Sequence, residues 1–152
     1  MLHVVLIEPE IPQNTGNIAR TCLAAGARLH LVEPLGFSTD AAALRRAGMD
    51  YWERCDVRQW PSFEALRSAA DPEAGVYFLT TKTSRRYWDA TFSDGDYLVF
   101  GRETRGLPES LLADEKARLL TVPMRADSRS LNLATSVGIV LYEACRQLRL
   151  PT

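Results

Sequence analysis

The chain has 152 residues, of which 46% are hydrophobic, and a formal net charge of −1, values typical of one soluble globular domain. No apolar run reaches the roughly 18 residues that cross a bilayer, and the start, Met1 to Glu8, lacks the basic region of a signal peptide and is interpreted as a strand. Three cysteines lie far apart without a CxxC pair, which excludes a disulfide framework or zinc site and favours the reducing cytoplasm.

Apolar runs alternate with amphipathic runs along the chain, and this alternation predicts strands and helices in turn. Asp40 and Ser62 are expected to cap helices, and Gly26 and Gly48 to follow helix ends. In chain order we expect a strand at 2–7, a helix at 14–25, a strand at 29–32, a helix at 41–47, a strand at 57–60, a helix at 62–70, strands at 76–80 and 97–100, a helix at 107–113, a strand at 119–122 and a helix at 131–148.

Strands with continuous apolar sequence that alternate with helices are typical of a mostly parallel sheet covered on both faces. We therefore predict a single α/β domain over residues 1–152, without internal repeats or linkers. Ligands of such sheets bind beyond the carboxyl ends of the strands. Polar residues that follow strands are therefore the candidates for function, and they occur at three places.

The first place follows the strand at 2–7 and leads into a helix. Asn14, Gly16, Asn17 and Arg20 lie in this segment. The free backbone N–H groups of a helix start form an anion site, and Asn17 and Arg20 share one helix face because they are three residues apart. The alternative is that Asn14 is only an N-cap and Arg20 a surface arginine.

The second place follows the strand at 97–100, where Gly101, Glu103 and Gly106 lie in a turn. Glycine at a strand end permits a ligand to approach the backbone closely. Glu103 is a candidate to hold a hydroxyl group or an arginine. The alternative is an ordinary turn that carries an Arg–Glu surface pair of little energetic value.

The third place joins the last strand to the last helix, where Ser128, Ser130 and Asn132 cluster. One of these residues is expected to cap the helix. Small residues on that helix, among them Ser136 and Gly138, permit close approach of another backbone. The alternative is helix capping together with core packing.

Taken in order, the motifs Pro-x-Asn-x-Gly-Asn-x-x-Arg-Thr, Phe-Gly-x-Glu-x-x-Gly-Leu and Pro-Met-…-Ser-Leu-Asn-Leu resemble those of the SPOUT RNA methyltransferases over essentially the whole chain. The similarity is greatest to the short enzymes that methylate the wobble ribose of tRNA. The resemblance implies a C-terminal deep trefoil knot, which general topology rules would exclude. It also implies a homodimer and a cytoplasmic location.

The resemblance further implies that the chain methylates the 2′-hydroxyl of cytidine or modified uridine 34 in the anticodon stem-loop of tRNA, with leucine isoacceptors as the expected substrates. S-adenosylmethionine (SAM) is the implied cosubstrate, and no metal is expected. The residues implied to bind SAM are Leu79, Thr80, Gly101, Val122, Ser130 and Leu131. The residues implied to form the catalytic and substrate set are Asn14, Arg20, Glu103, Ser130 and Asn132.

Arginine stays protonated in proteins, so we interpret Arg20 as a ligand of the adjacent phosphate that stabilises the developing alkoxide, with Glu103 orienting Arg20 or Asn14. Trp88 and Tyr87 beside arginines suit single-stranded RNA loops. The candidate phosphate contacts are Arg45, Arg46, Arg85, Arg86, Arg105, Arg125 and Arg129.

The sequence departs from the resembled pattern at two places, since Arg102 stands where proline is common and Ala134-Thr135 replaces Ser-Asn. Three other functions stay open. One is methylation of another tRNA position or of ribosomal RNA, and another is a non-catalytic RNA- or SAM-binding module. The third, a serine hydrolase, is disfavoured because His3 and His30 lie in predicted strands and GxSxG is absent.

Overall fold

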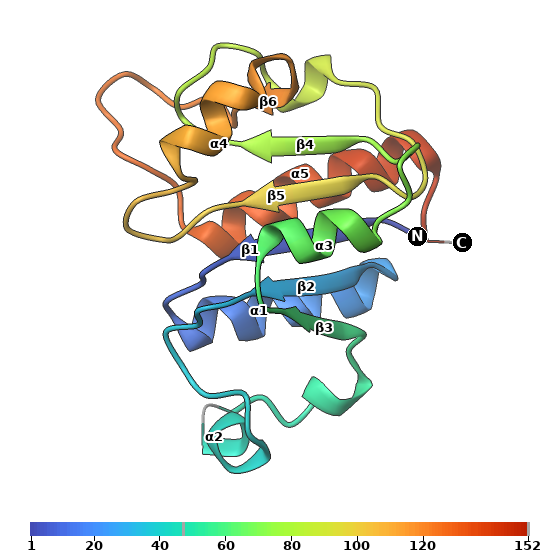
Figure 1. Cartoon of the computed structure of the whole chain (residues 1–152), viewed down its shortest axis with the longest axis vertical. Helices are drawn as coiled ribbons and strands as arrows, with labels where there is room; N and C mark the ends of the chain where they lie inside the picture. Colours follow the sequence, from blue (N-terminus) through green and yellow to red (C-terminus); the bar gives the residue numbers. More distant parts are fainter. Residues whose placement is uncertain (47, 152) are drawn as a thin grey trace.

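A computed structural model describes residues 1–46 and 48–151. Six strands form one sheet in the order β3-β2-β1-β5-β4-β6, and every pairing between them is parallel (Figure 1). The strands are β1 (His3–Ile7), β2 (Arg28–Val32), β3 (Val57–Trp60), β4 (Val76–Leu79), β5 (Tyr97–Phe100) and β6 (Leu119–Leu120). The helices are α1 (Pro12–Ala25), α2 (Ala41–Arg46), α3 (Phe63–Ala69), α4 (Glu109–Asp114) and α5 (Leu133–Leu148). The predicted parallel α/β fold is confirmed.

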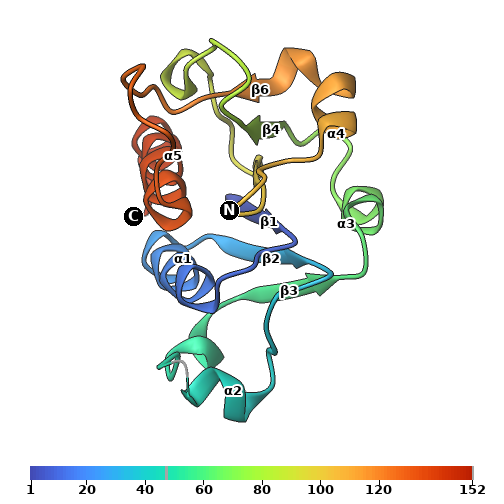
Figure 2. The same cartoon turned by 90° about the vertical axis from the view of Figure 1, so that its left-hand side faces the viewer.

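Helices cover both faces of the sheet, as Figure 2 shows, with α1 and α5 on one face and α3 and α4 on the other. Side chains of a strand alternate between faces. Val4 and Leu6 of β1 accordingly pack in the cluster that includes α1 and α5. Val5 and Ile7 pack in the opposite cluster with residues of α3 and α4. Since β1 is central and buried on both sides, its apolar sequence is continuous, as predicted for a parallel sheet.

Several predicted helix ends are confirmed by their caps. The Ser62 hydroxyl accepts a hydrogen bond from the backbone N–H of Ala65 at 3.1 Å, and the Asp40 carboxylate accepts one from Ala43 at 2.8 Å. Gly26 ends α1 with a left-handed φ of 71°, which glycine adopts without steric cost. Ala47, the last residue of the helix predicted at 41–47, lies outside the described residues.

Several predicted boundaries differ from the structure. One-residue differences occur at the starts of β1, β2 and α3 and at the ends of α3, β4 and α4. Helix α1 begins at Pro12 rather than at residue 14, since proline suits the first helical position. Helix α4 begins two residues later than predicted, after Pro108, and α5 begins two residues later, after its cap Asn132. Strand β6 has two residues instead of four, because Thr121 forms only an isolated bridge before the chain leaves the sheet. Three 3₁₀ turns, at Trp52–Arg54, Tyr87–Asp89 and Lys116–Arg118, were not predicted.

Within the described residues, every helix is too short or too polar to cross a membrane.

Candidate active site

A cavity of about 530 Å³ opens at the carboxyl edge of the sheet. Its walls come from the segments that follow β1, β4, β5 and β6 and from the start of α5, which is the edge where parallel sheets bind ligands. Every residue expected to bind the cofactor lines this cavity, namely Leu79, Thr80, Gly101, Val122, Ser130 and Leu131. The sequence motifs, far apart in the chain, therefore meet at one site.

The loop after β5 is closed tightly against its own start. Arg102 and Gly106 exchange two backbone hydrogen bonds, of 3.2 and 2.9 Å, and Gly106 has a left-handed φ of 67°. A Cβ atom on Gly101 would lie 2.1 Å from the carbonyl carbon of Gly106. Any side chain at position 101 would collide with the backbone of Gly106, so the loop itself requires glycine there. The sequence suggests glycine for another reason, the close approach of a ligand.

The Glu103 carboxylate binds the beginning of α1 from across the sheet edge. Its two oxygens accept hydrogen bonds from the backbone N–H groups of Glu10, at 2.9 Å, and Ile11, at 2.7 Å. A negative charge is favourable at this end of a helix. Among the described residues Glu103 forms no ion pair, so the alternative of an Arg–Glu surface pair is wrong; the expectation that Glu103 holds a hydroxyl group stays a prediction. Its partners are backbone N–H groups and Asn14, and it contacts Asn14 but not Arg20.

Asn14 joins Glu103 to Asn132. The Asn14 side chain donates from Nδ2 to Glu103 at 3.4 Å and accepts at Oδ1 from Asn132 Nδ2 at 3.1 Å. Asn132 in turn accepts at Oδ1 from the backbone N–H of Thr135, at 3.2 Å, and so caps α5. Asn14 is buried and is not the N-cap of α1, which is Ile11. The alternative that Asn14 is only an N-cap is therefore wrong. Asn132 does cap a helix, but it also binds Asn14.

Arg20 lies apart from the cavity, on the exposed face of α1. Its guanidinium carbon is 5.6 Å from the centre of the Tyr51 ring, and the Tyr51 hydroxyl donates to the carbonyl of Gly16 at 2.6 Å. Arg20 and Asn17 line a second, more open hollow between α1 and α5. Asn132 lines both this hollow and the cavity. The structure thus brings together Asn14, Glu103, Ser130 and Asn132, and Arg20 faces Asn132 from the other side.

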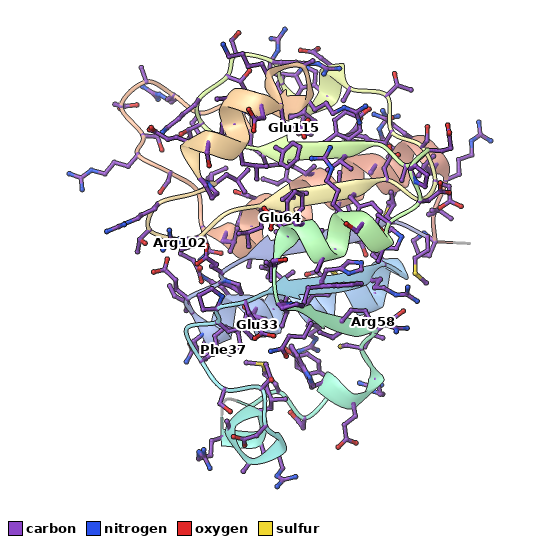
Figure 3. The ribbon with its side chains drawn as sticks, in the orientation of Figure 1. Glu33, Phe37, Arg58, Glu64, Arg102 and Glu115 are labelled. Atoms are coloured by element: carbon purple, nitrogen blue, oxygen red, sulfur yellow. The ribbon has the colours of Figure 1, made fainter. Side chains whose placement is uncertain are left out.

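The charge around the cavity is mainly positive. Lys82, Arg102, Arg105 and Arg129 line it, and Lys82 is paired with Glu109 at 2.7 Å. The Glu103 charge is compensated by backbone N–H groups. Arg102 lies beside the carboxyl ends of β1 and β5, where Figure 3 labels it.

Across residues 1–46 and 48–151, no cluster of His, Cys, Asp and Glu is arranged to hold a metal ion.

The seven arginines predicted to contact phosphates are spread over the surface. Arg105 and Arg129 line the cavity, whereas Arg45 and Arg46 lie on α2, at the far end of the molecule (Figure 1). The Arg86 guanidinium lies 5.3 Å from the centre of the Trp88 ring, whose side chain is 47% exposed. One contiguous basic face is therefore not formed, and the arginines nearest the cavity are the strongest candidates.

Three residues of the site were missed by the sequence analysis. Tyr51 contacts Arg20, and Glu10 and Thr104 bond to each other at the edge of the cavity. Each pair depends on contacts between segments more than 30 residues apart, and local patterns of hydrophobicity carry no signal for such contacts.

Comparison with known proteins agrees with this geometry. The model of the SpoU rRNA methylase family matches residues 1–142. The tRNA (cytidine(34)-2′-O)-methyltransferase of Escherichia coli K12 is 49% identical, over 99% of this chain and 96% of its own. A solved structure concerned with 2-OH methylation of C/U34 on tRNA has a TM-score of 0.90 and 49% identity, covering 98% of this chain and 97% of its own.

A more distant solved structure is the AdoMet-bound rRNA methyltransferase of Sinorhizobium meliloti, with a TM-score of 0.79 and 31% identity. It covers 99% of this chain, which spans 57% of that protein. The family model matches most of the chain, and the resemblance indicated by the three motifs is confirmed. The chain therefore belongs to the SpoU rRNA methylase family.

Proposed function

We propose that the protein transfers a methyl group from SAM to the ribose 2′-hydroxyl of nucleotide 34, cytidine or modified uridine, in tRNA. The observation that carries this proposal is the meeting of the three motifs around one cavity, where Asn14, Glu103 and Asn132 form a continuous hydrogen-bonded row. The nearly full-length relative that is 49% identical acts, by its name, on cytidine 34 of tRNA. Leucine isoacceptors are the first substrates to test.

The cavity fits SAM in size and chemistry. Its volume of about 530 Å³ lies within the range of roughly 300–1,000 Å³ that is usual for small-molecule sites. Leu79, Val122 and Leu131 offer apolar walls, and Thr80 and Ser130 offer hydroxyl groups. When bound, SAM supplies an electrophilic methyl group on a sulfonium.

The protein's own groups then position the acceptor ribose. Asn132 stands between the cavity and the hollow that holds Arg20, so a ribose beside Asn132 has the methyl donor on one side and the guanidinium on the other. Arg20 binds the adjacent phosphate and stabilises the negative charge that develops on the 2′-oxygen. Holding the reacting atoms in line is worth several kcal/mol of barrier.

We propose that the protein is a homodimer and that its C-terminal segment forms a trefoil knot. The α1–α5 hollow supports the dimer, because it is lined by small residues and by Tyr142, which is 44% exposed. A second copy on this face would cover Arg20. Sedimentation of the wild type as a dimer, and of Tyr142→Glu as a monomer, is the expected result; a monomeric wild type would contradict it. Trp88→Glu, at the other exposed aromatic residue, is the control.

For the RNA we propose contact with Arg105 and Arg129 at the cavity, and with the outlying candidates Arg45, Arg46, Arg85, Arg86 and Arg125. Arginine forks suit phosphate oxygens. Trp88 is exposed enough to stack on a nucleobase. Lysine and arginine residues make up 18 of the chain's 152 residues, yet the net charge is −1. Binding therefore depends on where the arginines lie rather than on overall charge.

A ribose of ribosomal RNA is the second candidate substrate. It is favoured by one observation, the 31% identity to an rRNA methyltransferase. The higher identity to the tRNA enzyme over nearly its whole length favours tRNA.

The test is methyl transfer from labelled SAM to bulk RNA from cells that lack this protein, followed by nucleoside mapping. Label in 2′-O-methylcytidine or 2′-O-methyluridine at position 34 is the expected result. Label confined to ribosomal RNA would reject the tRNA substrate and keep the chemistry. Absence of label from both RNAs would reject the proposed activity.

A further inference from the structure

Two loops beside the cavity exchange hydrogen bonds reciprocally. The Glu103 carboxylate accepts from the backbone N–H groups of Glu10 and Ile11. In return, one oxygen of the Glu10 carboxylate accepts from the backbone N–H of Thr104, at 3.1 Å, and from its hydroxyl, at 2.8 Å. The two loops follow β1 and β5 and are more than 90 residues apart in sequence. Each therefore supplies a carboxylate that binds the other's backbone.

The same two loops are held rigidly at their outer ends. The backbone N–H of Gly36 donates to the carbonyl of Pro9 at 2.9 Å, and a Cβ atom on Gly36 would lie 2.8 Å from the Glu10 carbonyl oxygen. On the other side, the segment from Gly101 to Gly106 closes on itself. The reciprocal bonds therefore join two stiff segments, and the shape of one constrains the shape of the other.

We propose that Glu10 is a positioning residue that holds the loop from Arg102 to Gly106 in the shape required for SAM binding. The loop lines the cavity; the Glu10 side chain binds it through Thr104, and the Glu10 backbone N–H binds it through Glu103. The proposal rests on the assignment of the cavity to SAM under the proposed function, and it does not depend on tRNA being the substrate. We call the reciprocal hydrogen bonds of Glu10 with Thr104 and of Glu103 with Glu10 and Ile11 the clamp. Since Glu103 also binds Asn14, the clamp joins the loop from Arg102 to Gly106 to the residue that orients Asn132.

The bonds from Thr104 to Glu10 are charge-assisted, because the Thr104 hydroxyl and N–H hold the pKa of the Glu10 carboxyl below its usual range. Such bonds are stronger than neutral ones, but Thr104 is exposed, so water replaces them in part. We therefore expect loss of the clamp to weaken SAM binding about tenfold, within the range that one or two lost hydrogen bonds produce.

The test measures SAM binding by calorimetry without RNA, and the Michaelis constants for SAM and tRNA. Glu10→Ala and Thr104→Val are each expected to raise the Kd for SAM about tenfold. Glu10→Gln keeps an acceptor oxygen, and Thr104→Ser keeps the hydroxyl, so each is expected to stay within about threefold of the wild type. The KM for tRNA is expected to change by less than about twofold, and Tm by only a few degrees.

A double variant and a cavity variant separate the possible failures. Glu10→Ala combined with Thr104→Val is expected to be no worse than Glu10→Ala alone, since Glu10→Ala already removes both bonds from Thr104, including the hydroxyl bond that Thr104→Val removes; additive losses would overturn the clamp. Val122→Trp is expected to fill the cavity and abolish SAM binding. Unchanged SAM binding by Val122→Trp would overturn the cavity assignment and the clamp with it. Unchanged binding by Glu10→Ala, with loss in Val122→Trp, would overturn the clamp alone. Weakened binding in Glu10→Ala without any wobble methylation by the wild type would support the clamp and reject the substrate.

Discussion

The chemistry of single residues decides what Arg20 does. Its guanidinium carbon lies 5.6 Å from the centre of the Tyr51 ring, and the Tyr51 hydroxyl is fixed by the Gly16 carbonyl, so the guanidinium has a fixed aromatic partner. A planar fork binds phosphate oxygens in pairs, whereas an ammonium group is a point charge. The proposed role of Arg20 depends on this difference.

Arg20→Lys is therefore expected to lower kcat about 100-fold, the loss typical of removing one oriented donor to a developing oxyanion. Arg20 is exposed, so Tm is expected to stay within a few degrees of the wild type. Single-turnover methylation of tRNA measures the effect, with Arg149→Lys, at an exposed arginine that ends α5, as the matched control. Near-normal kcat in Arg20→Lys would rule out the oriented-fork role.

His3 and His30, which the sequence analysis placed in strands, form a chain of neutral rings outside the site; His30 is buried and His3 is half-buried. Trp60 Nε1–H donates to His30 Nδ1 at 3.0 Å, and His30 Nε2 lies 2.9 Å from His3 Nδ1. The acceptor role of Nδ1 requires neutral His30 with its proton on Nε2. Burial lowers the pKa of His30 to about 3 and that of His3 to about 4.

Protonation of these rings favours the unfolded chain, in which histidine has a pKa of about 6.5. The free energy of unfolding is therefore expected to be constant above that pH and to fall as the pH decreases toward 4. The charged groups around the rings are Arg28, Arg58, Asp56, Asp94 and the terminal amine. Because the pKa values of both aspartates are already lowered, urea unfolding between pH 7.5 and 5 isolates the histidines. A double variant, His3→Gln with His30→Gln, is expected to show a flatter profile, and an equally steep one would contradict the assignment.

At the scale of elements, the beginning of α5 is shared between folding and function. Asn132 uses its oxygen to cap α5 at Thr135 and its amide nitrogen to bind Asn14. The two tasks belong to different atoms of one side chain. A substitution that keeps one atom and changes the other can therefore separate them.

Asn132→Asp keeps the capping oxygen and is expected to leave Tm within a few degrees of the wild type. The substitution places a carboxylate at position 132 against Asn14, which already faces the Glu103 carboxylate on its other side. The Asn14 amide has one donor group and one oxygen, so in either orientation its oxygen faces one of the two carboxylates. Methylation is expected to fall by at least about tenfold, the equivalent of roughly 1.4 kcal/mol. Asn132→Ala removes both atoms and is expected also to lose about 1 kcal/mol of stability as the cap disappears. Equal thermal losses in the two variants would contradict this division.

Much of this arrangement of elements could be predicted from sequence, and the reasons are local. Strand β5 has the predicted bounds because its apolar run lies between Asp96 and Gly101, and β3 has them because Pro61 follows its last residue. The predicted start of α1 was two residues late, and the residues just before the helix, Glu10 and Ile11, donate to Glu103, a residue about 90 positions away. Arg20 was grouped with the catalytic residues by motif, while the packing of α1 against α5 turns it to the other side of Asn132. Side-chain orientation across packed elements is set by tertiary contacts that no local pattern contains.

At the scale of the molecule, the net charge differs in sign from the local charge around the cavity. The net charge is −1, but the cavity is lined by Arg102, Arg105 and Arg129, and the Glu103 beside them is already bound by backbone N–H groups. The attractive field is therefore local, and it acts over about 10 Å at 0.1 M salt. Association with tRNA is expected to depend on salt even though the protein as a whole repels polyanions weakly.

Arg105 and Arg129, which line the cavity, are expected to supply much of that field. Each phosphate neutralised contributes about 0.7–0.9 to the slope of log Kd against log salt concentration. The double variant Arg105→Gln with Arg129→Gln is therefore expected to reduce this slope by about 1.5. Filter binding of tRNA measures the slope over a salt range of roughly 50 to 300 mM, in which phosphate contacts make the affinity depend on salt. Arg149→Gln, at the opposite end of α5, is the control and is expected to leave the slope unchanged. A slope that is equally reduced by Arg149→Gln would mean that overall charge, rather than the cavity, governs RNA binding. An unchanged slope in the double variant would move the phosphate contacts to the outlying arginines on α2 and beside Trp88.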